Sequence, residues 1–200
     1  MSLLFAMISF SLAMSISPGP VNIIILSSGA NYGIRRTFPF VSGATIGFTL
    51  LLVFIGLGFH KIISQYPYFL KYLAIAGSLF IMYMGYLIAS SKPELHIERK
   101  SRPSFLQGFI LQWLNPKAWM ACIAGVSLFS SPDGNQLFLT FLLIYFFVCY
   151  FSLFSWSVLG DKATVILGSH FRITVFNKAM GVLLVLTACF LLYVQFIENT

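Results

Sequence analysis

The sequence contains very little charge. Only 8% of its 200 residues are Asp, Glu, Lys or Arg, whereas 58% are hydrophobic. A soluble domain carries about 25% charged residues, and the mean hydropathy of this chain is +0.91. This composition indicates an integral membrane protein whose surface contacts membrane lipids. The length suffices for roughly six spans of 20 to 25 residues, so we expect a single transmembrane domain over residues 1–200.

Cysteine and acidic residues are also scarce, which argues against several kinds of site. Cys122, Cys149 and Cys189 each stand alone within an apolar run, and no CxxC pair occurs. Neither a dithiol redox relay nor a cysteine metal cluster is therefore indicated, and no cofactor is expected. All acidic residues fall in expected connections or at span ends: Glu94, Glu98, Asp133, Asp161 and Glu198.

Six long apolar runs predict six transmembrane helices. They cover about residues 3–26, 37–59, 68–90, 104–128, 137–159 and 179–197. The polar stretches 27–36 and 160–178 are expected to be connections. The most charged connection, at about 91–103, divides the chain into repeat one (1–90) and repeat two (104–200). Since each half crosses the membrane three times, two structural repeats would insert with opposite orientations. The expected fold is all-α, with two inverted three-helix repeats.

The basic residues predict the orientation. Nine of the twelve lie in the first, third and fifth connections: Arg35, Arg36, Lys92, Arg99, Lys100, Arg102, Lys162, Arg172 and Lys178. The opposite side has only Lys61 and Lys71. Because cytoplasmic loops carry the excess of Lys and Arg, we expect the odd connections in the cytoplasm and both termini outside. The net charge of +7 is then a topological signal and not a nucleic-acid-binding surface. Asp161 is expected to be solvated at the cytoplasmic end of the fifth span.

Two of the spans are interrupted by proline. Pro18, Gly19 and Pro20 break the first span and Pro116 breaks the fourth, because proline removes a backbone donor and clashes with the preceding turn. The breaks lie about 15 and 12 residues into their spans, roughly 22 and 18 Å deep in a bilayer of about 40 Å. Irregular backbone at that depth must be buried or line a cavity. Interrupted helices at matching positions of two halves indicate the substrate site of a transporter.

Polar side chains accompany both breaks: Asn22 in the first span, and Gln112, Asn115 and Lys117 in the fourth. A charge at membrane depth is expensive and usually faces the bundle interior or water. Lys117 lies about 11 residues, roughly 16 Å, from the outer end of its span. A lysine side chain spans about 6 Å, so snorkelling does not bring it to the headgroups. With no acidic residue inside any span, we expect a substrate carboxylate to be its counter-ion.

The broken backbone offers complementary groups. The three prolines deprive three carbonyl groups of their usual intrahelical donors, those of Met14, Ile16 and Gln112. Such carbonyls can hold an ammonium group, whereas the half-helix N-termini after the breaks favour a carboxylate. A zwitterionic substrate needs both kinds of binding group, one for its ammonium and one for its carboxylate. The predicted substrate-binding residues are Pro18, Gly19, Pro20, Asn22, Gln112, Asn115, Pro116 and Lys117.

These motifs resemble the LysE/RhtB family of bacterial amino-acid exporters. In the first half the resemblance rests on Ser17-Pro-Gly-Pro20, Asn22, Gly33, Arg35, Gly43 and Gly47. In the second half it rests on Phe105, Gly108-Phe109, Gln112, Asn115-Pro-Lys117, Phe176-Asn-Lys178 and Gly181-Val-Leu-Leu184. It implies a secondary-active exporter of small amino acids or related metabolites in the bacterial cytoplasmic membrane, driven by protons. Threonine/homoserine and cysteine/O-acetylserine types both fit. Asn22-Ile23 and Leu26-Ser-Ser28, together with Arg35, most closely resemble the cysteine/O-acetylserine branch.

Three other classes remain as alternatives. A membrane-embedded redox or cation-handling protein of related architecture would need paired cysteines or clustered ligands at membrane depth. A membrane enzyme would need an HExxH motif, paired intramembrane aspartates or a Ser-His dyad, and the sequence shows none of these. A non-transporting scaffold would not need Lys117 at membrane depth. The sequence leaves open which amino acid is carried and whether copies associate as a homo-oligomer.

Overall fold

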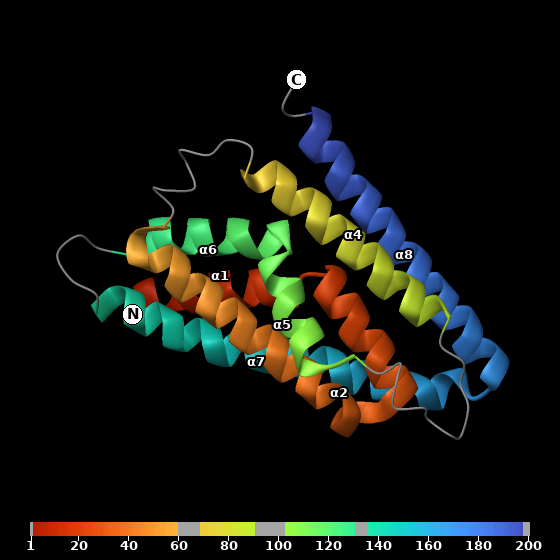
Figure 1. The fold of residues 1–200 in the computed structure, drawn as a ribbon. Coiled ribbons are helices and arrows are strands. Elements are labelled where there is room, and N and C mark those ends of the chain that lie inside the picture. Colours follow the sequence, from red (N-terminus) through yellow and green to blue (C-terminus); the bar gives the residue numbers. More distant parts are fainter. Residues whose placement is uncertain (1, 60–68, 91–102, 131–135, 198–200) are drawn as a thin grey trace.

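The computed structural model describes residues 2–59, 69–90, 103–130 and 136–197. All regular structure within these ranges is helical (Figure 1): α1 (Ser2–Ile16), α2 (Pro20–Phe54), the π-helix η1 (Ile55–Phe59), α4 (Phe69–Ala89), α5 (Phe105–Trp113), α6 (Pro116–Phe129), α7 (Gln136–Leu167) and α8 (His170–Ile197). The charged connection predicted at 91–103 lies outside the described residues except for its last residue, and so do Lys61, Asp133 and Glu198.

Four described helical segments are long and apolar enough to cross a membrane: Pro20–Gly58, Lys71–Ala89, Gln136–Ala163 and Phe171–Tyr193. The predicted helix breaks are confirmed. α1 ends at Ile16 and α2 begins at Pro20, while α5 ends at Trp113 and α6 begins at Pro116. Both second segments start with proline at the first helical position, where its missing N–H removes no helical hydrogen bond.

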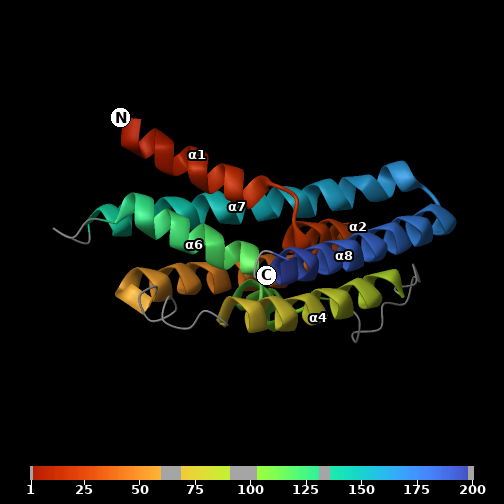
Figure 2. The same cartoon turned by 90° about the horizontal axis from the view of Figure 1, so that it is seen from above.

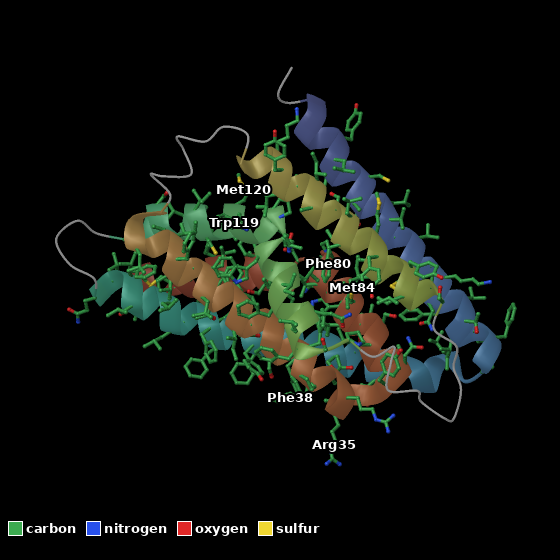
Figure 3. The ribbon with its side chains drawn as sticks, viewed as in Figure 1. Arg35, Phe38, Phe80, Met84, Trp119 and Met120 are labelled. Atoms are coloured by element: carbon green, nitrogen blue, oxygen red, sulfur yellow. The ribbon has the colours of Figure 1, made fainter. Side chains whose placement is uncertain are left out.

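The first connection differs from the prediction. The stretch 27–36 is not a polar loop, because α2 runs through it and changes direction at Gly33, which has φ 75° and ψ 170°. This backbone conformation is essentially restricted to glycine, and it lets the chain turn within one residue. Ser27 and Ser28 are buried as part of the first arm of α2 (20–32), and the second arm follows Gly33. Arg35 is exposed and extends away from the bundle just after the kink (Figure 3).

The fifth connection is also shorter than predicted. α7 continues to Leu167 and α8 begins at His170, so only residues 168 and 169 separate two helices that together contain most of 160–178. Gly168, with φ 59°, makes this reversal. Asp161 therefore lies within α7 and not at the end of a helix. A Cβ atom added at Gly33 would lie 3.2 Å from an Asp161 carboxylate oxygen, which places that carboxylate at the α2 kink.

The main helix contacts join the two halves of the chain, and the most extensive of them is between α2 and α7. α1 packs on α7, α5 packs on α2, and α4 packs on α8. Figure 1 shows α4 and α8 side by side, and Figure 2 shows α1 and α4 on opposite faces of the bundle. Glycines permit the close approach: the backbone carbonyl of Phe105 lies against Gly43, and Gly85 and Gly181 each face the other's carbonyl oxygen. Small residues at such crossings are typical of helix pairs in lipid.

Candidate substrate-binding site

The two interrupted helices meet at Lys117. Its ammonium group donates hydrogen bonds to the backbone carbonyl oxygen of Ser17 at 3.0 Å and to the Ser17 hydroxyl at 2.8 Å. Ser17 lies in the break between α1 and α2, and Lys117 lies in the first turn of α6. The two bonds therefore join the proline motifs of the two halves, which are 100 residues apart in the sequence.

The second break fixes the position of this lysine. Asn115 is the N-cap of α6, and its side-chain oxygen accepts a hydrogen bond from the backbone N–H of Lys117 at 3.2 Å. This arrangement satisfies a backbone donor that has no partner within the helix. The indole N–H of Trp119 donates to the carbonyl oxygen of Trp113 at 2.7 Å and satisfies an acceptor at the end of α5. Lys117 thus projects from a capped first turn.

Side chains also close the first break. The amide nitrogen of Asn22 donates to the carbonyl oxygen of Ser15 at 3.0 Å, from the first turn of α2 back to the last turn of α1. The indole N–H of Trp156 in α7 donates to the carbonyl oxygen of Ile16 at 3.2 Å. Because both bonds end on backbone carbonyls at the end of α1, they hold the break in one conformation. Neither of these two hydrogen bonds involves the side-chain oxygen of Asn22.

The carbonyl groups at the breaks lack their usual intrahelical donors, as predicted, but they are not left unpaired. Each of the three named carbonyl oxygens, those of Met14, Ile16 and Gln112, accepts a hydrogen bond from a substitute donor. The Ser17 hydroxyl donates to the first at 3.3 Å, the Trp156 indole to the second at 3.2 Å, and the backbone N–H of Asn115 to the third at 3.3 Å. Side chains and a tightened last turn replace the donors that proline lacks. The carbonyl that does hold an ammonium group is that of Ser17, and the ammonium belongs to the protein.

A small cavity lies beside Lys117, with a volume of about 40 Å³. It is lined by Met14, Ser15, Val21, Asn22, Phe48, Gln112, Asn115, Lys117, Ala118, Ala121, Tyr145, Cys149 and Leu153. Four of the eight predicted binding residues are in this lining: Asn22, Gln112, Asn115 and Lys117. The other four, Pro18, Gly19, Pro20 and Pro116, are not in it and act on the site through the shape of the backbone. Gly19 borders the lysine, since a Cβ atom there would lie 3.4 Å from the Lys117 nitrogen.

Several lining residues were missed by the sequence reasoning. Ser15 comes from α1, Phe48 from the second arm of α2, and Tyr145 and Cys149 from α7. Each is a single residue in an apolar helix, and nothing in the local sequence shows which face of that helix lines a cavity. Only the packing of α7 against α1 and α2 brings them to the site.

The charge of the site is unbalanced. Lys117 is half-buried and is the one charged residue among the described residues that line the cavity. Asp161 is the only acidic residue in the described part of the chain, and it lies at the α2 kink and not in this lining. An ammonium group has three donors, and Ser17 takes two of them. The third is available to an anionic ligand in the cavity.

The side chains around the cavity suit an organic ion better than a metal. Among the described residues, no group of three His, Cys, Asp or Glu side chains is placed to hold a metal ion. Amide groups, hydroxyls and one ammonium dominate the polar part of the lining. These groups recognise carboxylate and ammonium groups by hydrogen bonding.

The chain is similar to known efflux proteins. Residues 12–195 match the LysE type translocator family. The cysteine/O-acetylserine efflux protein of Escherichia coli (strain K12) is 30% identical over 138 residues, which cover 68% of this chain and 70% of that protein. The protein of the same name from Klebsiella pneumoniae subsp. pneumoniae is 27% identical over 135 residues, 68% of this chain and 69% of that protein. No solved structure matches the chain. Because the family match extends over most of its length, the chain is a multi-pass membrane protein that belongs to the LysE type translocator family.

Proposed function

We propose that this protein is a secondary-active exporter of small amino acids or related metabolites across the bacterial cytoplasmic membrane. Family membership and the efflux named in its relatives support amino-acid export. The observation that carries the proposal is the placement of Lys117 between two interrupted helices, beside a cavity whose described lining residues include no acidic one. Such a cation is expensive in a membrane and calls for an anionic ligand.

The substrate carboxylate is assigned to the α6 side of the cavity. The third donor of the Lys117 ammonium is available there, and the N-terminus of α6 adds the positive end of the helix dipole. The Asn115 side-chain oxygen is occupied by its capping bond, so the amide nitrogen is the group that it can offer to an anion. Charge-assisted hydrogen bonds of this kind are roughly twice as strong as neutral ones.

The substrate ammonium is assigned to the amide oxygens of Asn22 and Gln112. Both side chains are buried and line the cavity. Because the Asn22 nitrogen is engaged by Ser15, its oxygen is the end that remains for a cation. The two amides replace the backbone carbonyls that the sequence suggested for this role.

The helix packing supports an architecture of two inverted repeats. The first half-helix of each half packs on the second helix of the other half, α1 on α7 and α5 on α2, and the third helices α4 and α8 pack on each other. Phe48 and Tyr145 stack with ring centroids 4.4 Å apart, and they follow Pro18 and Pro116 by 30 and 29 residues. Exchanging the halves would reproduce these pairings, which supports a pseudo-two-fold axis in the membrane plane. We infer six crossings, with α1 and the first arm of α2 as the first and α5 and α6 as the fourth.

During transport, the hydrogen bonds between Lys117 and Ser17 would be exchanged for bonds between Lys117 and the substrate carboxylate. A cavity of about 40 Å³ holds on the order of three water molecules, so the site must widen to admit an amino acid. A substrate carboxylate competes with Ser17 for the same ammonium, and its binding would release the tie between the two breaks. Rocking of one half against the other around this point gives alternating access.

The orientation and the coupling ion are part of the same proposal. Arg35, Arg172 and Lys178 are exposed, as are Arg36 and Lys162, in keeping with a cytoplasmic surface for the first and fifth connections. Both termini are then outside. Protons are proposed as the coupling ion because the family resemblance implies proton-driven export.

The test is the amino-acid content of the medium around cells that overproduce the protein. Export of the carried amino acid should fall about 10- to 100-fold in Lys117→Met, because a hydrogen bond to a charged group contributes about 1.5–3 kcal/mol. Lys162→Met, at an exposed residue of α7 outside the cavity lining, serves as the matched control and should export normally. Membrane insertion of each variant is checked in the membrane fraction. Equal export by Lys117→Met and wild type would refute the role of the lysine, and no accumulation by wild type would refute export.

A further inference from the structure

A further contact between the two halves of the chain lies nine residues along the first arm of α2 from Asn22. Asn31 of this arm and Asn177 of α8 exchange two hydrogen bonds, because the amide nitrogen of each donates to the amide oxygen of the other at 2.7 Å. The Asn31 nitrogen also donates to the carbonyl oxygen of Ser27 at 2.7 Å. Since a carbonyl oxygen can only accept, this bond fixes which end of the Asn31 amide is the donor. Nine helical residues span about 13 Å, so the pair lies beyond the cavity in the direction of the α2 kink.

A small hollow lies beside this pair, between the first arm of α2 and α4. Its lining includes Ser27, Ser28 and Asn31 from α2 and Met84 from α4, the last of which is labelled in Figure 3. The hollow has a volume of about 10 Å³, which is close to the least that holds one water molecule. No amino acid passes here in this conformation. Ser28 is 2% exposed and its hydroxyl has no hydrogen-bond partner among the described residues, so water that entered the hollow would remove a burial cost.

The first arm of α2 is held by α7 and by α8 in different ways. Its contact with α7 is close backbone packing, in which Gly29 lies against the carbonyl of Ser157 and Gly160 lies against the carbonyl of Leu26. Helices that part from such packing lose their van der Waals contacts outright. The contact with α8 includes the amide pair, whose groups can bond to water when they separate, so that the net loss is small. The seam between this arm and α8 therefore opens at the lower cost.

We propose that Asn31 and Asn177 are the cytoplasmic gate of the transport path. When they are paired they close the way from the cytoplasm to the cavity, and their separation admits the substrate. The inference rests on the proposed export function. It deepens that function because it names the contact that must break before a substrate reaches Lys117, at two residues outside the cavity lining.

The groups that the opened gate would expose suit the passage of a zwitterion. The two amides and the hydroxyls of Ser27 and Ser28 can both donate and accept hydrogen bonds, so they can replace water around a carboxylate and around an ammonium. The described lining of the hollow contains no charged residue. A substrate would therefore be solvated at this point without being held by an ion pair, and the ammonium of Lys117 would be the first charge that it meets in the cavity.

The first test locks the gate. In a chain whose cysteines at 122, 149 and 189 are replaced by serine, Asn31→Cys and Asn177→Cys are joined by methanediyl bismethanethiosulfonate, a short reagent that dithiothreitol cleaves. Uptake of L-threonine and of O-acetyl-L-serine into inside-out vesicles should fall to the background of vesicles without the protein, and reduction should restore it. Each single-cysteine variant treated with the same reagent is the matched control and should keep its uptake. A contact that only stabilises the structure could be locked without this loss.

The second test needs no substrate. In the same cysteine-free chain, Ser28→Cys reports opening of the gate through its reaction with the impermeant reagent 2-sulfonatoethyl methanethiosulfonate, added to inside-out vesicles. Asn177→Ala removes both bonds of the amide pair and should speed this reaction roughly 5- to 100-fold, as the loss of two net hydrogen bonds implies. Ser42→Ala is the matched control, because it removes a hydrogen bond to Tyr150 between α2 and α7 and should leave the rate unchanged.

The outcomes separate the gate from the export function. Uptake that continues after mass spectrometry shows the two cysteines to be joined would overturn the gate, and so would equal reaction rates at Ser28→Cys with and without Asn177→Ala. If the double-cysteine variant takes up nothing before it is joined, the reaction rates alone decide. Wild-type vesicles that take up neither amino acid would instead count against export of these substrates, whatever the reaction rates show about the gate.

Discussion

At the scale of single residues, Lys117 and Ser17 form the contact on which the account depends. The ammonium is held by the backbone carbonyl of Ser17, in the break between α1 and α2, and by the hydroxyl of the same residue. If these two hydrogen bonds served only to stabilise the structure, they would be expected to stay formed at all times. In a transport site, the same hydrogen bonds must instead be weak enough for a substrate carboxylate to replace Ser17 as the partner of Lys117.

Removing half of this tie should therefore improve substrate binding. Ser17→Ala deletes the hydroxyl that accepts from Lys117 at 2.8 Å but keeps the carbonyl bond. A net hydrogen bond contributes about 0.5–1.5 kcal/mol, so the KM for uptake into inside-out vesicles should fall roughly two- to tenfold. A KM that rises in Ser17→Ala would show that the hydroxyl binds substrate directly and does not compete with it.

At the scale of helices, the sequence predicted the breaks correctly and two of the connections incorrectly. Pro18 and Pro116 act locally, because each removes an N–H donor and clashes with the preceding turn, so both breaks could be found without a structure. The kink at Gly33 could not, since a glycine in a polar stretch is equally compatible with a loop. The same holds for α7, where the polar residues after Leu159 remain helical to Leu167.

The kink at Gly33 should be intolerant of any side chain. Gly33→Ala places a Cβ atom in a backbone conformation that costs of order 1–3 kcal/mol, and 3.2 Å from the Asp161 carboxylate. Gly58→Ala is the matched control, because Gly58 also has a positive φ, 96°, but no atom of the described residues lies within 4 Å of the added Cβ. Unfolding in detergent should show the larger loss of stability for Gly33→Ala. Equal losses would mean that the contact with Asp161 is of no consequence.

At the scale of the whole molecule, most of the candidate site's lining comes from residues whose positions depend on packing. Asn22, Gln112, Asn115 and Lys117 could be selected because they are polar residues beside a break. Tyr145 could not, because its role arises only where α7 crosses α1 and α2. Helix packing thus adds a wall that local sequence rules do not describe.

The proposed inverted arrangement makes a direct prediction about topology. In a chain with its three cysteines replaced, Gln136→Cys and Ser169→Cys introduce thiols at two exposed positions, at the start of α7 and between α7 and α8. A membrane-impermeant maleimide should label Gln136→Cys in intact cells and Ser169→Cys only after the cells are permeabilised. Labelling of both in intact cells would contradict the proposed orientation of the second repeat.

The central claim is that Lys117 binds the substrate carboxylate, and the most direct measurement compares an exported amino acid with its carboxamide. The two compete for uptake into inside-out vesicles of wild type and of Lys117→Met. In wild type the carboxamide should compete at least about tenfold less well, since it lacks the charge that pairs with the ammonium. In Lys117→Met, which binds both weakly, this difference should disappear. A carboxamide that competes equally in wild type, or a difference that persists in Lys117→Met, would contradict the account.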